Sequence, residues 1–125
     1  MEFRENEAIY LQIAAHVGDH ILLGKWGLNE KIPSVRDLAV DLQVNPNTVM
    51  RSYEFLQAQE VILNKRGIGF FVTPDAKKKI MVDRKASFLG QELPEFFRKL
   101  DLMGISMEDI TARFESFKSA KQSEK

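Results

Sequence analysis

The spacing of apolar side chains predicts a first helix over residues 8–23. Its apolar positions recur at intervals of four: Ile9, Ile13, Val17 and Ile21. This interval places them on one face of a helix, where they form a stripe that must be buried. Asn6 is the predicted N-cap. Gly24 is suited to the left-handed conformation that ends a helix.

Two shorter helices follow, joined by too few residues for anything but a turn. The first is predicted over residues 34–42, because Ser34 and Asp37 have the spacing of a capping box. The second is predicted over residues 46–59, with Asn45 as its N-cap and a proline in its first turn, where a missing N–H costs nothing. Two capped helices joined this closely predict a helix-turn-helix.

Residues 61–74 change from a helical to a strand pattern. β-Branched and aromatic residues predict strands at 61–64 and 70–73, on either side of a basic turn. Gly67 and Gly69 suit the positive φ angles that such turns need. The sequence therefore predicts a β-hairpin.

The C-terminal residues 75–125 are predicted to be helical, with a kink or break at Gly90 and Pro94 and a last helix after a second capping box at Ser106. This segment is too short to bury its many large apolar side chains internally. The surplus predicts an interface with a second copy of the chain. The predicted dimer interface is Phe88, Leu89, Leu93, Phe96, Phe97, Leu100, Ile110 and Phe114.

Together these elements predict a mainly α fold with a small β-hairpin, divided into a domain at residues 1–74 and a helical tail at 75–125. The chain has no cysteine, which excludes disulfides and thiolate chemistry. It also has no apolar run of the ~20 residues that span a bilayer, and its N-terminus does not resemble a signal peptide. We expect a cytoplasmic protein.

Net charge does not favour nucleic-acid binding. The whole chain is neutral, and residues 1–74 contain 7 Lys and Arg against 9 Asp and Glu. A DNA-binding interpretation therefore depends on where the basic residues lie, since phosphate contact needs only a local basic face.

The sequence resembles the GntR family of bacterial transcription regulators. The resemblance rests on four phrases: IYLQIA at 9–14, IPSVRDLA at 32–39, VNPNTVMRSYEFL at 44–56 and KRGIGFFV at 65–72. The short C-terminal segment, LGQELPEFFRKLDLMGISMEDI at 89–110, resembles the YtrA-like subgroup, which has a two-helix dimerisation tail. The resemblance implies a winged helix-turn-helix. The chain departs from the family pattern at Leu28-Asn29, where Pro-Gly is usual, and at Glu60, where Gly is usual.

The resemblance also implies which residues contact DNA. They are Ser34, Arg36, Asn45, Asn47, Thr48, Arg51, Lys65, Arg66 and Gly67. The chemistry agrees, since the first turn of a recognition helix enters the major groove, Asn pairs with adenine, and Arg pairs with guanine or phosphate. Structural alternatives remain: Arg36 as a partner of Asp37 or Asp41, Arg51 as a partner of Glu54, and Asn45 as a cap alone.

Other candidate sites have simpler explanations. His16 and His20 have the i, i+4 spacing of a metal chelate, but the local sequence supplies no third ligand, so structural histidines are favoured. The aromatic tail is favoured as an interface over a ligand pocket. The lysines at 77–79 are favoured as a solvated helix face. We predict no metal and no cofactor.

The leading hypothesis is a dimeric, sequence-specific DNA-binding regulator that represses a transporter operon. Its predicted partners are a palindromic double-stranded operator, a second copy of the chain and a possible small-molecule effector. The alternative is a winged-helix module that binds protein without DNA specificity. An enzyme is disfavoured because the sequence has no cysteine, no His-carboxylate cluster and no P-loop.

Overall fold

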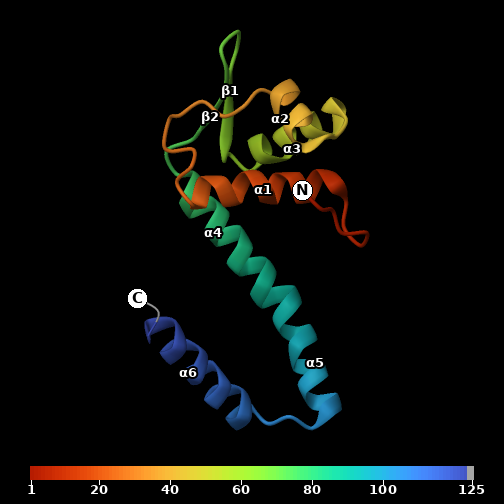
Figure 1. The fold of residues 1–125 in the computed structure, drawn as a ribbon, viewed down its shortest axis with the longest axis vertical. Helices are drawn as coiled ribbons and strands as arrows, with labels where there is room; N and C mark the ends of the chain where they lie inside the picture. Colours follow the sequence, from red (N-terminus) through yellow and green to blue (C-terminus); the bar gives the residue numbers. More distant parts are fainter. Residues whose placement is uncertain (124–125) are drawn as a thin grey trace. The chain divides into compact units, whose positions relative to one another are not determined.

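The computed structural model describes residues 1–123 and divides the chain into two compact units. Met1–Asp83 form the first unit, here called the head, and Arg84–Lys125 form the second, here called the tail. The elements follow in the order α1 (Ile9–Leu22), α2 (Val35–Leu42), α3 (Pro46–Ala58), β1 (Ile62–Lys65), β2 (Gly69–Val72), α4 (Ala76–Ser87), η1 (Phe88–Glu92), α5 (Leu93–Met103) and α6 (Met107–Ser123). The predicted mainly helical fold with one small hairpin is confirmed (Figure 1).

The predicted N-cap of α1 is wrong. The helix begins at Ile9, and Ala8 occupies the cap position without a side-chain hydrogen bond. Gln12 instead holds the preceding segment: its side chain accepts a hydrogen bond from the Arg4 N–H and donates to the carbonyls of Arg4 and Glu7. The predicted end is right, since Gly24 has a φ of 78°.

The helix-turn-helix begins each helix with the predicted cap. The Ser34 hydroxyl accepts a hydrogen bond from the Asp37 N–H at 3.1 Å. The Asn45 side chain accepts one from the Asn47 N–H at 2.8 Å. Gln43 forms the tight turn between the helices with a φ of 57°. The starts of α2 and α3 are therefore both fixed by hydrogen bonds between residues close together in the sequence.

The hairpin is antiparallel, and its strands pair from Ile62 with Val72 to Lys65 with Gly69. Each strand is shifted by one residue from the predicted 61–64 and 70–73. A third segment joins the hairpin, because the Ile32 N–H donates to the Phe70 carbonyl and the Lys31 backbone pairs with Phe71. This segment links the hairpin to the start of α2.

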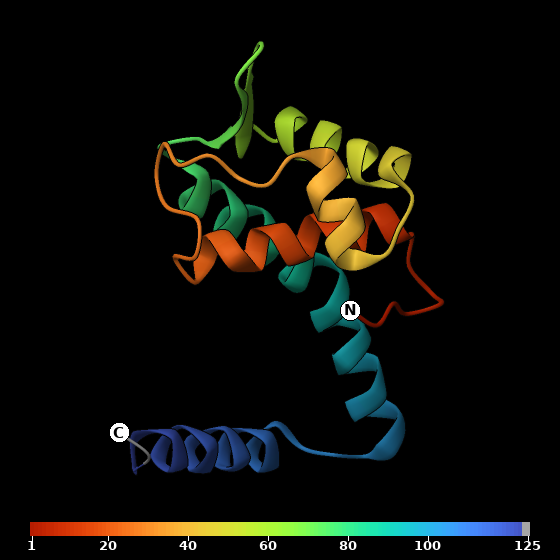
Figure 2. The same cartoon turned by 45° about the horizontal axis from the view of Figure 1, so that its top comes forward.

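The head has one hydrophobic core to which α1, α2, α3, the hairpin and the start of α4 all contribute. Figure 2 shows the three helices packed together, with the hairpin projecting beyond them. Tyr53 is fully buried, and its hydroxyl donates to the Pro33 carbonyl at 2.7 Å. The Ser52 hydroxyl donates to the Tyr10 carbonyl at 2.7 Å. These two bonds fix α3 against both α1 and the segment before α2.

The division by compactness falls inside α4 rather than at Pro74. Ala76 and Ile80 are buried in the head core, so the first turns of α4 pack with the head. The predicted interruption near Gly90 takes the form of the π-helical segment η1, followed by Pro94 in the first turn of α5.

The tail buries little of its own apolar surface. Within the described residues 84–122, Leu100 is the one buried side chain. Of the other predicted interface residues, Leu93 and Ile110 are half-buried. The rest are exposed: Phe88, Leu89, Phe96, Phe97 and Phe114. Leu100 is therefore already covered in the isolated chain.

Candidate nucleic-acid interface

The first turn of α3 presents a polar surface next to its buried face. Asn45 and Asn47 are exposed and Thr48 is half-buried, whereas Val49 is fully buried. The Asn45 side-chain oxygen serves as the cap, which leaves its amide nitrogen as a donor. The exposed Asn47 amide carries both a donor and an acceptor, as bidentate contact with a base requires.

The start of α2 presents Ser34 and Arg36, both exposed. Sequence alone left Arg36 as a possible partner of a nearby carboxylate. Among the described residues, Arg36 forms no hydrogen bond or ion pair. Its guanidinium is therefore free to meet an anion outside the chain.

Arg51 lies over the ring of Tyr10, with its guanidinium carbon 3.9 Å from the ring centroid. The Tyr10 ring in turn packs edge-on against Phe55 at a centroid separation of 6.2 Å. The expected alternative partner, Glu54, is not involved. A cation held over an aromatic face keeps its charge and its outward N–H groups, so this stack restricts where Arg51 can reach.

The tip of the hairpin presents two basic side chains, Lys65 and Arg66, at a short turn. The Ile68 N–H donates to the Lys65 carbonyl at 2.8 Å, and Gly67 has a φ of 78°. The Lys65 ammonium lies 4.3 Å from the Phe71 ring centroid. Arg66 and Gly67 are exposed. The turn therefore displays Arg66 beside a glycine whose backbone is open to close approach.

Gly69 is required by its backbone conformation rather than by crowding, because the atom nearest to an added Cβ belongs to the end of a flexible lysine side chain. Its φ is 141°, and a Cβ at this position would lie 2.7 Å from the Lys31 Cε. The lysine side chain therefore crosses the base of the turn, where it adds a third positive charge to the hairpin.

The basic residues of this surface have no internal carboxylate partners. Lys31, Arg36, Arg51, Lys65 and Arg66 account for five of the seven Lys and Arg in residues 1–74. None of the five forms an ion pair within residues 1–123. A neutral chain thus carries a local set of unpaired cations on the helix-turn-helix and hairpin, as phosphate binding requires.

The two histidine rings pack against each other and against a tryptophan. The rings of His16 and His20 are 4.3 Å apart, and His20 stacks on Trp26 at 4.8 Å. Burial lowers the pKa of His16, and the neighbouring His20 lowers it further. Within residues 1–123, no three His, Cys, Asp or Glu side chains lie together as a metal site would require.

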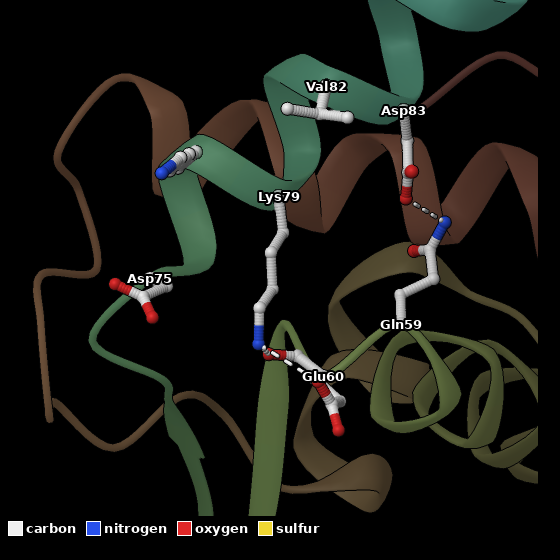
Figure 3. A pocket seen from close by; sticks show the side chains of 7 residues that line it. Gln59, Glu60, Asp75, Lys79, Val82 and Asp83 are labelled. Carbon is white, nitrogen blue, oxygen red and sulfur yellow. Dashed lines mark hydrogen bonds and ion pairs between the residues drawn. The ribbon is translucent and has the colours of Figure 1, made fainter.

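An open pocket of about 390 Å³ lies between the end of α3 and the start of α4 (Figure 3). Two polar contacts cross it. Lys79 pairs with Glu60 at 3.1 Å, and the Gln59 amide donates to Asp83 at 3.0 Å. Glu60 has a φ of 61°, in the left-handed region that favours glycine. These contacts join α4 to the base of the hairpin.

Two exposed apolar residues on this surface were not predicted from the sequence as DNA contacts. Met50 lies on α3 one turn after Asn47, and Ile68 lies in the hairpin turn. The i, i+3 spacing from Asn47 could have indicated Met50. The role of Tyr10 was also not predicted, because its contact with Arg51 joins residues far apart in the chain.

Comparison with known proteins identifies the fold and the family. Residues 9–72 match the family described as bacterial regulatory proteins, gntR family. A crystal structure of a GntR-family transcriptional regulator from Bacteroides thetaiotaomicron is 53% identical, with a TM-score of 0.80, and covers 91% of this chain and 99% of that one.

Two relatives from Bacillus subtilis (strain 168) extend this match over most of the chain. The HTH-type transcriptional regulator YhcF is 30% identical over 93% of this chain and 94% of its own length. The HTH-type transcriptional repressor YtrA is 30% identical over 86% of this chain and 82% of its own length. Both are described as regulators rather than enzymes. No helix within residues 1–123 is long and apolar enough to cross a membrane. The chain belongs to the GntR family of bacterial transcription regulators, which bind DNA, and within it to the YtrA-like subgroup.

Proposed function

We propose that the protein is a cytoplasmic homodimer that binds a palindromic operator and represses transcription of a transporter operon. The observation that carries the proposal is the set of unpaired cations on α2, α3 and the hairpin. The description of the relative YtrA as a repressor supports the direction of regulation.

In this proposal α3 enters the major groove with its first turn. Asn47 and Thr48 contact base edges there, and the free amide of Asn45 lies beside the phosphate backbone. Ser34 and Arg36 contact phosphates from the start of α2, where free N–H groups also favour an anion. Arg51 contacts the backbone from its position over Tyr10.

The hairpin acts as the wing and follows the minor groove. Lys65 and Arg66 neutralise phosphates or enter the groove, and Gly67 allows the turn to approach the sugar edges closely. Lys31 extends the same basic surface toward α2.

The tail supplies the dimer interface. Four of its exposed aromatic residues, Phe88, Phe96, Phe97 and Phe114, are between 40% and 56% accessible in the isolated chain. Apolar surface of this kind is stabilised by burial at about 25 cal/mol per Å², and a two-fold symmetric interface buries the same patch on both copies. Two linked heads would then match two half-sites about one helical turn or a little more apart.

A small-molecule effector would act through α4. The pocket at the junction of α3 and α4 is crossed only by exposed polar pairs, Lys79 with Glu60 and Gln59 with Asp83. Exposed pairs of this kind contribute roughly 0–1 kcal/mol. A ligand could therefore break them at low cost and shift how α4 leaves the head.

Selection of bound sequences from random duplexes tests the DNA-binding half of the proposal. We expect a palindromic consensus, with binding that weakens as salt is raised. In the selected duplex, Arg36→Ala should weaken binding by on the order of 1–3 kcal/mol with thermal stability nearly unchanged. Failure to select any duplex would favour the protein-binding module, and a large loss of stability would give Arg36 a structural role.

Sedimentation tests the dimer. The full chain should sediment as a dimer, and the Phe96→Glu, Phe97→Glu double variant as a monomer. Leu23→Glu is the matched control, because Leu23 is an exposed apolar residue at the end of α1 in the head. A dimer that survives the tail variant but not the control would place the interface on the head.

A further inference from the structure

We infer that the head recognises A·T base pairs through two apolar side chains, Met50 on a thymine methyl group in the major groove and Ile68 in the minor groove. This inference rests on the proposed DNA-binding function and names the base pairs that it selects. It follows from an unusual feature of the DNA-facing surface: two of its contact segments carry exposed apolar residues among unpaired cations.

Met50 is placed to meet base edges. It lies on α3 three residues after Asn47, so the two side chains are neighbours on one helix face. It is 39% exposed, whereas the next residue of the turn that faces inward, Tyr53, is fully buried. The Met50 side chain is therefore only partly covered by the head, and the rest of it is accessible to DNA. The one large apolar group that the major groove offers is the thymine methyl.

Ile68 is exposed and does not belong to the hydrophobic core of the head. It occupies the turn between the paired ends of the hairpin, Lys65 and Gly69, and is 60% accessible. Turns of this kind favour Gly, Asn, Asp and Ser, because those residues tolerate the backbone and solvate well. A β-branched apolar residue in this turn is explained if DNA covers the turn in the complex.

The minor groove distinguishes base pairs by a single donor. A G·C pair places the guanine 2-amino group in the groove, and an A·T pair does not. An apolar side chain desolvates that amino group without pairing it, which is costly, but it packs against an A·T pair without this penalty. Apolar side chains inserted in the minor groove are a known means of contact, and Arg66 beside Ile68 is suited to the strong negative potential of a narrow A·T groove.

Asn47 agrees with this preference. An exposed asparagine amide pairs bidentately with adenine, so the polar and apolar residues on one face of α3 both select the same base pair. Leu23, an exposed apolar residue at the end of α1, lies outside the DNA-facing segments.

Thymine replacement tests Met50. In the duplex obtained by selection, each thymine is replaced in turn by deoxyuridine, which removes only the methyl group. We expect one position in each half-site where the wild-type protein binds about fourfold more weakly, the effect of exposing one methyl group. At that position Met50→Ala should bind both duplexes equally. The inference is wrong for Met50 if every deoxyuridine effect persists in Met50→Ala.

Inosine replacement tests Ile68. The A·T pairs beneath the wing are replaced by G·C or by I·C, which lacks the 2-amino group and so has the minor groove of A·T. We expect G·C to weaken wild-type binding by on the order of tenfold and I·C to be tolerated. Ile68→Ala should lose the discrimination between them, and Ile68→Val should keep it. Equal losses for G·C and I·C, or discrimination that survives Ile68→Ala, would overturn the assignment.

Leu23→Ala is the matched control for both measurements and should behave as wild type. The outcomes separate this inference from the function on which it rests. A protein that selects no duplex contradicts the proposed function itself. A protein that binds its selected duplex tightly, but shows neither the deoxyuridine effect nor the inosine effect, contradicts only the A·T preference.

Discussion

The stack of Arg51 on Tyr10 makes a prediction that tests how the DNA-contacting surface is organised. The guanidinium carbon lies 3.9 Å from the ring centroid, close enough for a cation–π interaction worth about 0.5–1 kcal/mol at an exposed site. If the stack holds Arg51 in the position from which it contacts phosphate, its loss should weaken DNA binding although Tyr10 itself touches no DNA. Tyr10 is then a positioning residue.

The magnitudes follow from these two contacts. Arg51→Ala removes a charge-assisted hydrogen bond to phosphate and should weaken operator binding by about 1–2 kcal/mol. Tyr10→Leu removes only the restriction of the side chain and should weaken it by about 0.5–1 kcal/mol, or roughly two- to fivefold. Because both act through one contact, the double variant should bind no more weakly than Arg51→Ala alone.

Fluorescence anisotropy titration of the selected duplex at one fixed salt concentration measures all four proteins of this cycle. Tyr10→Phe is the control, since it keeps the aromatic face and should bind as wild type. Urea unfolding checks that Tyr10→Leu, which still fills space against Phe55, leaves the fold intact. Additive losses would show that the two residues act independently. Tighter binding by Tyr10→Leu would show that the stack holds Arg51 away from DNA.

Two further predictions concern stability. Glu60 has a left-handed backbone with a φ of 61°, which costs a side chain roughly 1 kcal/mol and glycine almost nothing, so Glu60→Gly should exceed Glu60→Ala by about 1 kcal/mol in the free energy of unfolding. Both variants lose the ion pair with Lys79, so that loss cancels in the comparison. Urea unfolding monitored by Trp26 fluorescence measures the two stabilities, and equal values would contradict a strained backbone at position 60. Burial and His20 lower the pKa of His16 below its ordinary 6.5, so the unfolded chain takes up the proton first and stability should fall as the pH drops through 6.5. His16→Gln should flatten that slope, and an unchanged slope would assign it to other groups.

Local chemistry made much of the fold predictable from sequence. The caps at Ser34 and Asn45 need only a side chain and a backbone N–H two or three residues away, and both formed as expected. Asn29 takes the left-handed conformation with a φ of 61°, which asparagine adopts more readily than most residues other than glycine.

The features that sequence did not predict depend on residues distant in the chain. Asn6 fits a helix cap by type, but Gln12 holds the preceding segment through its backbone, and α1 begins two residues beyond the position that such a cap implies. Arg51 had an obvious partner three residues away in Glu54, yet the α1–α3 packing offers it Tyr10 instead. Periodicity also says nothing of a π-helical turn, because η1 changes the register by one residue without altering the apolar composition.

The small number of free cations limits how the head can hold DNA. Each phosphate that a cation neutralises contributes about −0.9 to the slope of log binding constant against log salt concentration. The five unpaired Lys and Arg side chains therefore permit a slope of only about −4 to −5 per head. Affinity drawn from that source alone would be lost at moderate salt. Two additional sources are consistent with the structure: apolar contact at Met50 and Ile68, which salt does not screen, and linkage of two heads through the tail, which makes the second half-site an intramolecular partner. In the proposed dimer, the exposed aromatic surface of the tail and the apolar residues of the DNA-facing surface would therefore compensate for the same shortage of charge.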